Sequence, residues 1–325
     1  MTVMNIVQAV NSTLKQEMKT DNNIIVLGED VGVNGGVFRA TEGLLKLYGK
    51  ERVIDTPLSE AGIIGTSIGL SVYGIKPVAE IQFSGFLYAG LDHLISHASR
   101  MRNRTRGRFT CPMVVRTPYS GGIHAPEHHS ESMEALLIHT PGLKVVIPST
   151  PSNTKGLLAA SIRDPDPVVF MEPKRVYRAI KEDVPDKSYT IPLGEAEVVT
   201  EGSDVTLISW GAMMKFSREA VEKLKEQKIN CELIDLRTVS PIDTDTIIKS
   251  VKKTGRAVIV HEAPRTCGLG AEISAQINER ALLSLKAPVE RVTGYDTVIP
   301  LYKMESYYLP DVKKIIKGVW KVVNF

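Results

Sequence analysis

Histidines gather in one short segment that opens with a pair of glycines and follows a predicted strand. Four of the seven histidines lie in or just after TPYSGGIHAPEHHSES, residues 117–132. These four are His124, His128, His129 and His139. The segment lacks the Cys/His set of a closed metal shell, so a metal site is a poor interpretation. Adjacent histidines on a loop point in different directions, so we expect one of His128 and His129 to transfer protons while the other histidines pack structurally.

A single carboxylate, Glu60, stands before a run of small and apolar residues in DTPLSEAGIIGTSIG, residues 55–69. Ser59 has the residue type of a helix N-cap, so Glu60 is predicted on the first helical turn. One interpretation is a favourable charge at a helix N-terminus, worth about 0.3–1 kcal/mol. The other is a functional acid on a helix whose small residues suit close packing. Burial would favour the neutral carboxyl and the helix dipole the charged one, so the sequence leaves both interpretations open.

Strands that alternate with helices must position these residues. Short apolar runs are typical of buried parallel strands at 23–28, 76–83, 112–118, 143–149 and 167–173. Helical spacing lies around and between them at 41–49, 61–74, 86–102 and 152–163. We therefore predict an α/β fold with doubly wound sheets, in which ligands lie beyond the carboxyl ends of the strands.

A charged, proline-containing stretch at 186–203 is predicted to link two domains, which span 1–185 and 204–325. Beyond it the alternation resumes, with strand-like runs at 204–211, 231–238, 256–264 and 289–294. Helical patterns separate these runs at 216–227, 243–254 and 270–285. The second domain is therefore predicted to be a smaller α/β unit.

Charge and composition argue against several classes of protein. A net charge of +3 is too small to indicate nucleic-acid binding, and the alternating arginines of 100–108 are interpreted as a solvated or subunit-facing loop. The first residues form an amphipathic helical pattern, which indicates neither a signal peptide nor a membrane span. Three widely spaced cysteines without a CxxC motif favour a reducing cytoplasm.

Nucleotide-binding motifs are incomplete. In CGLGAEI, Gly268 and Gly270 follow a predicted strand, but Ile273 stands where a dinucleotide fingerprint has its third glycine. A GxxxxGK[ST] phosphate loop is absent. NAD binding is therefore a weak interpretation.

Blocks of sequence along nearly the whole chain resemble one family. The blocks are GEDV, DTPLSEAGIIG, AEIQFSGF, HHSES, PGLKVVIPSTP, AASIRDPDPVVFMEP, GEAEVV, IDLRTVSPID and the terminal VVNF. Their order, from residue 5 to 325, resembles the beta subunit of the decarboxylating component of 2-oxoacid dehydrogenase complexes. These are thiamine diphosphate enzymes related to transketolase. The resemblance implies an N-terminal pyrimidine-binding domain and a smaller transketolase C-terminal-like domain.

The resemblance also assigns residues to the cofactor. Glu60 matches the glutamate that binds the ring nitrogen of the aminopyrimidine, where sharing a proton favours the reactive tautomer. Phe86 matches the aromatic residue that packs against the same ring. Four further residues match positions that line the cofactor, namely Glu29, Leu58, Ser59 and Gln82.

His129 matches a histidine beside the reaction centre, which is credited with proton or acyl transfer to the lipoyl arm. This sequence departs from the family at Glu131, where Gln or Asp is usual. By the same resemblance, Phe83, Ser84 and His128 are positions that could touch the substrate.

The segment SIRDPDP resembles a loop that binds potassium in some members of the family. The positions concerned are Met113, Ser161, Ile162, Asp164 and Asp166. Helix capping followed by a proline-rich turn is the alternative interpretation.

The GDG segment through which thiamine enzymes hold magnesium and the diphosphate is absent from this chain. The resemblance therefore implies that a separate alpha subunit holds both, in a heterotetramer of two alpha and two beta chains. A dihydrolipoyl acyltransferase core is the second implied partner. Its candidate contact is the chain end near Phe325, with Lys286 and Glu290 as candidate neighbours.

The substrate is expected to be a branched-chain 2-oxo acid or pyruvate, with a preference for branched-chain or broad specificity. An acetoin-cleaving enzyme with the same cofactor is one alternative. The other is a non-catalytic scaffold subunit.

Overall fold

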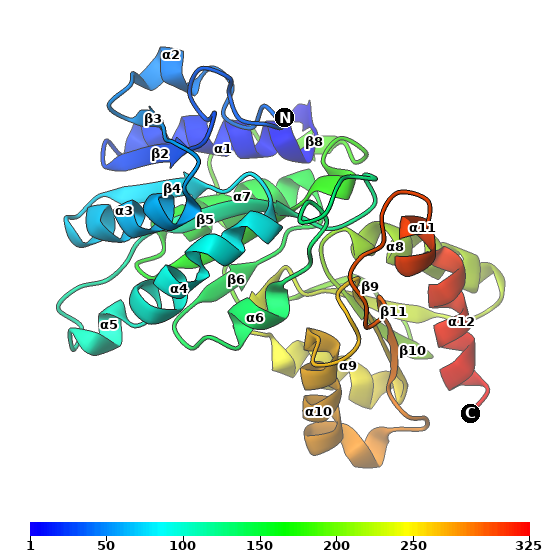
Figure 1. The fold of residues 1–325 in the computed structure, drawn as a ribbon. Coiled ribbons are helices and arrows are strands. Elements are labelled where there is room, and N and C mark those ends of the chain that lie inside the picture. Colours follow the sequence, from blue (N-terminus) through cyan, green and yellow to red (C-terminus); the bar gives the residue numbers. More distant parts are fainter.

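The computed structural model, which describes residues 1–325, contains two mostly parallel sheets that lie side by side (Figure 1). The larger sheet has the strand order β12-β6-β7-β5-β4-β2-β3. Its strands are β2 (Ile24–Gly28), β3 (Val53–Asp55), β4 (Lys76–Glu80), β5 (Val114–Tyr119), β6 (Lys144–Val146), β7 (Val168–Pro173) and β12 (Thr238–Ser240). All neighbours pair in parallel except β12, which comes from the second half of the chain and pairs antiparallel with β6. The predicted doubly wound α/β fold is confirmed.

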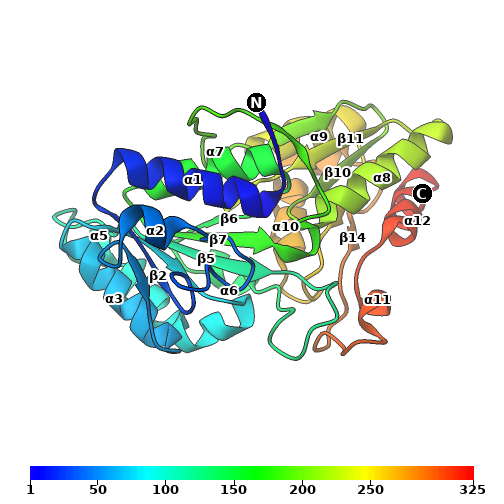
Figure 2. The ribbon, with the colours of Figure 1, turned by 90° about the horizontal axis from the view of Figure 1, so that it is seen from above.

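Successive residues of these strands face two different cores. Val114 belongs to the core that contains α1 (Ile6–Thr20) and α7 (Pro151–Arg163), whereas Val115 belongs to the core that contains α3 (Glu60–Val72). Helices therefore cover both faces of the sheet, as Figure 2 shows from above. Because both faces are buried, the strands are apolar runs rather than alternating patterns in the sequence.

The smaller sheet has the strand order β14-β13-β10-β11-β9. Its strands are β9 (Glu197–Thr200), β10 (Val205–Ser209), β11 (Cys231–Asp235), β13 (Ala257–Val260) and β14 (Glu290–Val292). The helices of this half are α8 (Met213–Glu226), α9 (Thr244–Thr254), α10 (Leu269–Ala281), α11 (Glu305–Tyr308) and α12 (Val312–Val323). Four strands are parallel, and β9 pairs antiparallel with β11 at the edge.

The predicted linker 186–203 is more structured than expected, because β9 lies inside it. The part before β9 runs along the first half of the chain: the Tyr189 hydroxyl donates to the Ser152 carbonyl at 2.8 Å, and the Ile191 amide donates to the Gly156 carbonyl at 3.1 Å. A half-buried strand of four residues gives too short a pattern to predict. The division into domains 1–185 and 204–325 remains our proposal.

The helix predicted over 86–102 is broken into short turns of different pitch. A 3₁₀ segment (Ser84–Gly90) leads into α4 (Leu91–His93), a π-helical turn (Leu94–Ala98) and α5 (Met101–Arg104). Gly90, the last residue of the 3₁₀ segment, packs directly against the backbone of Glu60 and the side chain of Ile64 in α3.

Six shorter elements complete the fold: α2 (Leu44–Tyr48), α6 (Glu134–Ile138), two 3₁₀ turns (Lys174–Val176 and Leu282–Ser284), and the paired strands β1 (Thr2–Met4) and β8 (Glu182–Val184). None of the helices combines the length and the apolar character that crossing a membrane requires.

Candidate active site

Residues that follow three neighbouring strands lie together at the carboxyl ends of the strands of the larger sheet. Glu29 follows β2, Glu60 opens the helix after β3, and Gln82 follows β4. Because β2 pairs with both β3 and β4, these segments emerge side by side. The Gln82 amide donates to an oxygen of Asp30 at 3.4 Å, which ties the β4 segment to the β2 segment.

Glu60 lies where the sequence predicts it, on the first turn of α3. The Ser59 hydroxyl accepts a hydrogen bond from the Gly62 amide at 3.3 Å, so the predicted N-cap is confirmed. The Glu60 side chain is half-buried and takes part in none of the hydrogen bonds or ion pairs of the chain. The small residues Gly62, Thr66 and Gly69 lie on the exposed face of α3. This chain alone therefore does not enclose the carboxylate in a dry pocket.

Glu29 lies close enough to Glu60 for their charges to interact. Burial raises the pKa of Glu29, and the negative charges of Asp30 and Glu60 raise it further. The Glu29 carboxylate, like that of Glu60, has no hydrogen-bond or salt-bridge partner.

Three rings form a second cluster beside these strand ends. The His129 ring lies 4.2 Å from the Phe83 ring and 5.1 Å from the Phe86 ring, measured between centroids, and its contact with Phe86 is edge-to-face. Phe83 and Phe86 also pack edge-to-face at 5.7 Å. The segment from Gln82 to Phe86 therefore contacts Asp30 through the Gln82 amide and the His129 ring through Phe83.

The orientation of His129 is set by its own loop. Its Nδ1 lies 2.9 Å from the Glu127 carbonyl oxygen. A carbonyl can only accept a hydrogen bond, so the neutral imidazole carries its hydrogen on Nδ1 and leaves Nε2 as a proton acceptor. This is the form that a general base requires.

The histidine loop, residues 120–131, which carries His129, is held against the segment that contains Phe83, Ser84 and Gly85. The buried Ser84 hydroxyl donates to the Glu131 carbonyl at 2.8 Å, and Gly85 lies so close to the His128 carbonyl that a Cβ atom would clash with it. His128 is exposed and has a positive φ of 65°, with its Nδ1 3.9 Å from a carboxylate oxygen of Glu131. Ser84 thus holds the loop, whereas His128 faces solvent.

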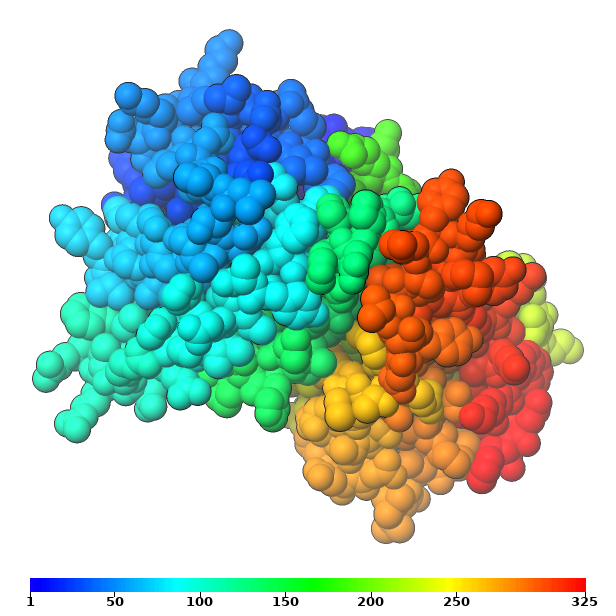
Figure 3. Space-filling view, viewed as in Figure 1, coloured from blue at the N-terminus to red at the C-terminus, as the bar shows by residue number.

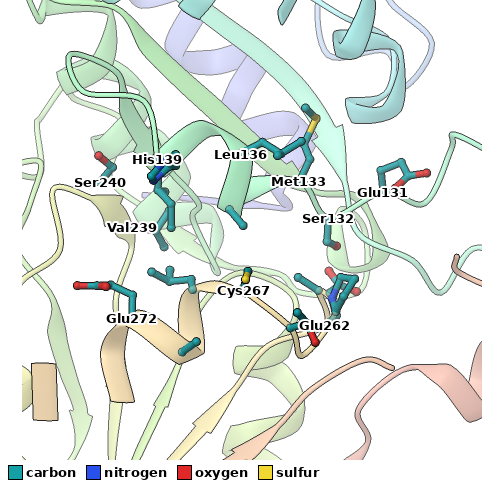
Figure 4. Close-up of a pocket in the computed structure, with 18 of the residues that line it drawn as sticks. Glu131, Ser132, Met133, Leu136, His139, Val239, Ser240, Glu262, Cys267 and Glu272 are labelled. Atoms are coloured by element: carbon teal, nitrogen blue, oxygen red, sulfur yellow. The ribbon is translucent and has the colours of Figure 1, made fainter. Parts of the chain in front are cut away.

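Leu58, one of the predicted cofactor-lining residues, is 72% exposed. A cavity of about 1620 Å³ lies between α6 on one side and the loop after β13 with the start of α10 on the other (Figure 4). None of the six predicted cofactor-lining residues lines it. They lie at an open surface instead.

The carboxylates of the predicted potassium loop are already paired. Lys144 binds Asp164 at 2.7 and 2.6 Å, and Arg102 binds Asp166 at 2.8 Å. Met113, Ser161 and Ile162 are buried, and the Met113 carbonyl accepts from the Val168 amide at 3.0 Å. No group of three or more His, Cys, Asp or Glu side chains gathers in a way that could hold a metal ion.

Two carboxylates that the sequence analysis did not single out also reach the histidine loop. Glu262 and Glu305, from the second half of the chain, accept hydrogen bonds from residues 120–124. No local motif marks either residue, because each acts on a segment more than a hundred positions away.

Comparison with known proteins agrees with this arrangement. Residues 2–180 match the family "Transketolase, pyrimidine binding domain", and residues 194–315 match "Transketolase, C-terminal domain". The chain is 51% identical to the pyruvate dehydrogenase E1 component subunit beta of Bacillus subtilis, over 100% of both chains. The counterparts from Acholeplasma laidlawii and Staphylococcus aureus are 50% and 49% identical, covering 100% of this chain and 99% and 100% of theirs. A structure named "Split gene transketolase, inactive beta4 tetramer" superposes with a TM-score of 0.81 at 21% identity, covering 99% of this chain and 98% of that one, which is a likeness of fold.

Proposed function

This chain belongs to the family of beta subunits of the thiamine diphosphate-dependent decarboxylating component of 2-oxoacid dehydrogenases, and we propose that it supplies the pyrimidine half of that active site. The observation that carries the proposal is the pair of unpartnered carboxylates, Glu29 and Glu60, beside the ring cluster of Phe83, Phe86 and His129.

The residues present fit an aminopyrimidine. Glu60 offers a carboxylate with no competing partner, and Phe86 offers a half-buried aromatic surface at the same strand ends. Glu29, Leu58, Ser59 and Gln82 complete the proposed lining. Thiamine diphosphate, when bound, supplies the nucleophilic carbon and the electron sink for loss of carbon dioxide from a 2-oxo acid.

Each of this chain's residues then has a limited task. Glu60 shares a proton with the ring nitrogen of the pyrimidine, and Glu29, whose pKa is raised by burial and by the neighbouring negative charges, lies close to it. His129 accepts or donates a proton through Nε2 while Nδ1 stays bonded to the Glu127 carbonyl. Phe83 and His128 border the space beside His129 in which we propose that the substrate lies, and Ser84 fixes the loop that bounds it.

An alpha subunit is the proposed source of the rest of the site. The open face of α3 and the exposed Leu58 support this proposal, since a partner chain would bury both and exclude water from Glu60. We propose that the same partner holds magnesium and the diphosphate, in a heterotetramer of two alpha and two beta chains. Burial of the carboxylate would therefore be completed only on assembly.

Potassium is proposed only as a structural ion. Since Lys144 and Arg102 already neutralise Asp164 and Asp166, the ion would depend on backbone carbonyls of Met113, Ser161 and Ile162. The melting temperature of the assembled enzyme in potassium chloride, compared with sodium chloride at equal ionic strength, tests this site directly.

The acyl acceptor is proposed to be the lipoyl group of a dihydrolipoyl acyltransferase. Phe325 is 80% exposed at the chain end, where it is available to such a partner. Of the two candidate neighbours, Glu290 is already paired with Lys321 at 2.7 Å, so a contact there would have to compete with that ion pair. The three unpaired cysteines support a reducing cytoplasm as the compartment.

Pyruvate is the substrate that we propose to test first, because the relatives that share about half of the sequence are named as pyruvate dehydrogenase subunits. The preference for branched-chain acids expected from the sequence stays a prediction. A pocket that is shared with another chain discriminates one methylene by only about 1–3 kcal/mol, so broad specificity is compatible with the proposal.

The deciding experiment is co-expression with the alpha subunit, followed by rates of decarboxylation and of lipoyl acylation. The panel contains pyruvate, three branched-chain 2-oxo acids and acetoin, with thiamine diphosphate and magnesium. Turnover of a 2-oxo acid by the mixture but not by the isolated beta chain supports the proposal. Equal rates for the beta chain alone contradict the half-site, and inactivity of the mixture on the whole panel indicates a scaffold subunit.

A further inference from the structure

The loop that carries His129 has a closed base. The amide of Ser120 donates to the carbonyl of Glu131 at 3.3 Å, which joins the two ends of residues 120–131. On one side, Ser84 of the first half of the chain donates to that same Glu131 carbonyl. The other side of the loop faces the second half of the chain.

Glu305 binds the first part of this loop. It is the first residue of α11, only 2% exposed, and its two oxygens accept the amides of Gly122 at 2.7 Å and His124 at 2.9 Å. Gly122 has a φ of +87°, and a Cβ atom there would lie 2.5 Å from Arg175. The backbone is therefore shaped to present these amides to the carboxylate. In the space-filling view, the orange residues that contain α11 border the green surface of this loop (Figure 3).

Glu262 binds the base of the loop. It follows β13, is 4% exposed, and a single oxygen accepts both the Ser120 hydroxyl at 3.1 Å and the Gly121 amide at 3.2 Å. Its other oxygen, Oε1, is buried without a partner. Figure 4 shows Glu262 on the side of the cavity that is formed by the second half of the chain, opposite Glu131 and Ser132. Lys174 also binds the Ser120 carbonyl, so the base is held from two sides.

We infer that Glu262 and Glu305 are positioning residues, which hold the loop so that His129 lies against Phe83 and Phe86. The inference rests on the proposed role of His129 in acyl transfer. The two carboxylates accept four hydrogen bonds from one short segment, three of them from backbone amides, and both are almost completely buried. Charge-assisted bonds of this kind fix a backbone more firmly than neutral ones. The second half of the chain thereby sets the geometry of a site that it does not line.

Replacement by glutamine should affect the two residues differently, because Glu305 uses both of its oxygens and Glu262 uses only one. In Glu305→Gln one carbonyl oxygen can serve only one of the two amides, and the new NH₂ group opposes the other, so transfer to a lipoyl domain should fall ~10-fold. In Glu262→Gln one carbonyl oxygen can keep both bonds, so the rate should stay within about twofold, whereas Glu262→Leu loses both and should fall ~10-fold. Glu232→Gln is the matched control, because Glu232 is 2% exposed, lies in β11 and bonds only Gly202 and Lys253.

Two readouts separate positioning from general destabilisation, both made on the alpha–beta assembly. Amide hydrogen exchange in a peptide that covers residues 119–131 should accelerate ~10-fold in Glu305→Gln but not in Glu232→Gln, because the lost acceptor frees an amide. Oxidative decarboxylation with a redox dye, which bypasses lipoyl transfer, should stay within about twofold.

The double variant Glu305→Gln/His129→Ala completes the design. If Glu305 acts through His129, the double variant should transfer acyl groups no more slowly than His129→Ala alone. Additive losses, or normal transfer in Glu305→Gln and Glu262→Leu while His129→Ala is impaired, would overturn the inference and leave the proposed function standing. Normal transfer in His129→Ala would overturn the proposed role of His129, and the inference with it.

Discussion

The imidazole of His129 lies against the ring of Phe83 with a centroid distance of 4.2 Å, while Nδ1 is bonded to the Glu127 carbonyl. The two residues come from loops that follow different strands, β5 and β4, which are neighbours in the sheet. The contact therefore depends on the strand order and not on any local motif. It leaves Nε2 as the atom of His129 that is free to exchange a proton.

His129→Ala should impair the step that uses this proton and spare cofactor binding. We expect transfer to a lipoyl domain to fall ~100-fold, the lower end of what a positioned acid or base contributes. The affinity for thiamine diphosphate, measured by calorimetry on the assembled enzyme, should be unchanged. His139→Ala is the control, since His139 is exposed in the same region and belongs to neither cluster. Equal losses in both variants would remove the special role of His129.

Phe86 should contribute to cofactor affinity through its ring and not through its size alone. Phe86→Ala removes both the proposed stacking surface and the edge-to-face contact with His129, so the Kd for thiamine diphosphate should rise ~10-fold. Phe86→Tyr keeps a ring of the same shape and should bind the cofactor within about twofold of the unmodified enzyme. A Kd that is unaffected by Phe86→Ala would place the pyrimidine elsewhere.

Glu60→Gln should abolish turnover without unfolding the chain. The carboxylate has no partner within the chain, so its replacement breaks no bond, but glutamine cannot share a proton with a ring nitrogen as a carboxyl does. We expect kcat to fall by at least ~100-fold, with an unchanged melting temperature. Exchange of the reactive carbon-bound proton of the cofactor, followed by NMR in deuterium oxide, should slow in parallel. Glu51→Gln, at an exposed site remote from the cluster, provides the control.

Much of this arrangement can be predicted from sequence because it depends on local chemistry. The buried runs at β2, β4, β5 and β7 identify parallel strands, and Ser59 identifies the start of α3. Once these are placed, the rule that ligands lie beyond strand ends brings the segments of Glu29, Glu60 and Gln82 together.

Other features depend on distant pairing, and no local pattern encodes them. The antiparallel strand β12 joins the first sheet from the second half of the chain, and its three residues give no periodic signal. Glu262 and Glu305 are single acids in unremarkable segments, whose roles emerge only when α11 and β13 meet the histidine loop. The 86–102 segment has helical spacing, yet it folds as short turns of different pitch, of which the first ends at Gly90 in close contact with α3.

Because of Glu134, we expect the stability of the folded chain to fall as the pH rises towards 7. It opens α6 directly after the histidine loop, is fully buried, and neither of its carboxylate oxygens has a hydrogen-bond partner. Burial raises the pKa of Glu134 to about 7, and the charge of Glu262 contributes to the rise. An acid whose pKa is higher in the folded chain than in the unfolded chain stabilises the fold below the unfolded value of about 4.3. That contribution is lost as the pH rises to about 7, because the folded chain must then release a proton that it holds more tightly.

Glu134→Gln should remove this dependence. Near pH 5 Glu134 is protonated and glutamine is nearly isosteric with it, so the two assemblies should melt at similar temperatures. At pH 8 the unmodified chain carries a buried charge that costs about 3–4 kcal/mol, so the variant should melt several degrees higher. Thermal unfolding of both proteins at pH 5, 6, 7 and 8 measures the difference directly, and all other titrating groups, Glu262 included, are common to both. A difference in melting temperature that is the same at every pH would mean that Glu134 does not titrate in this range.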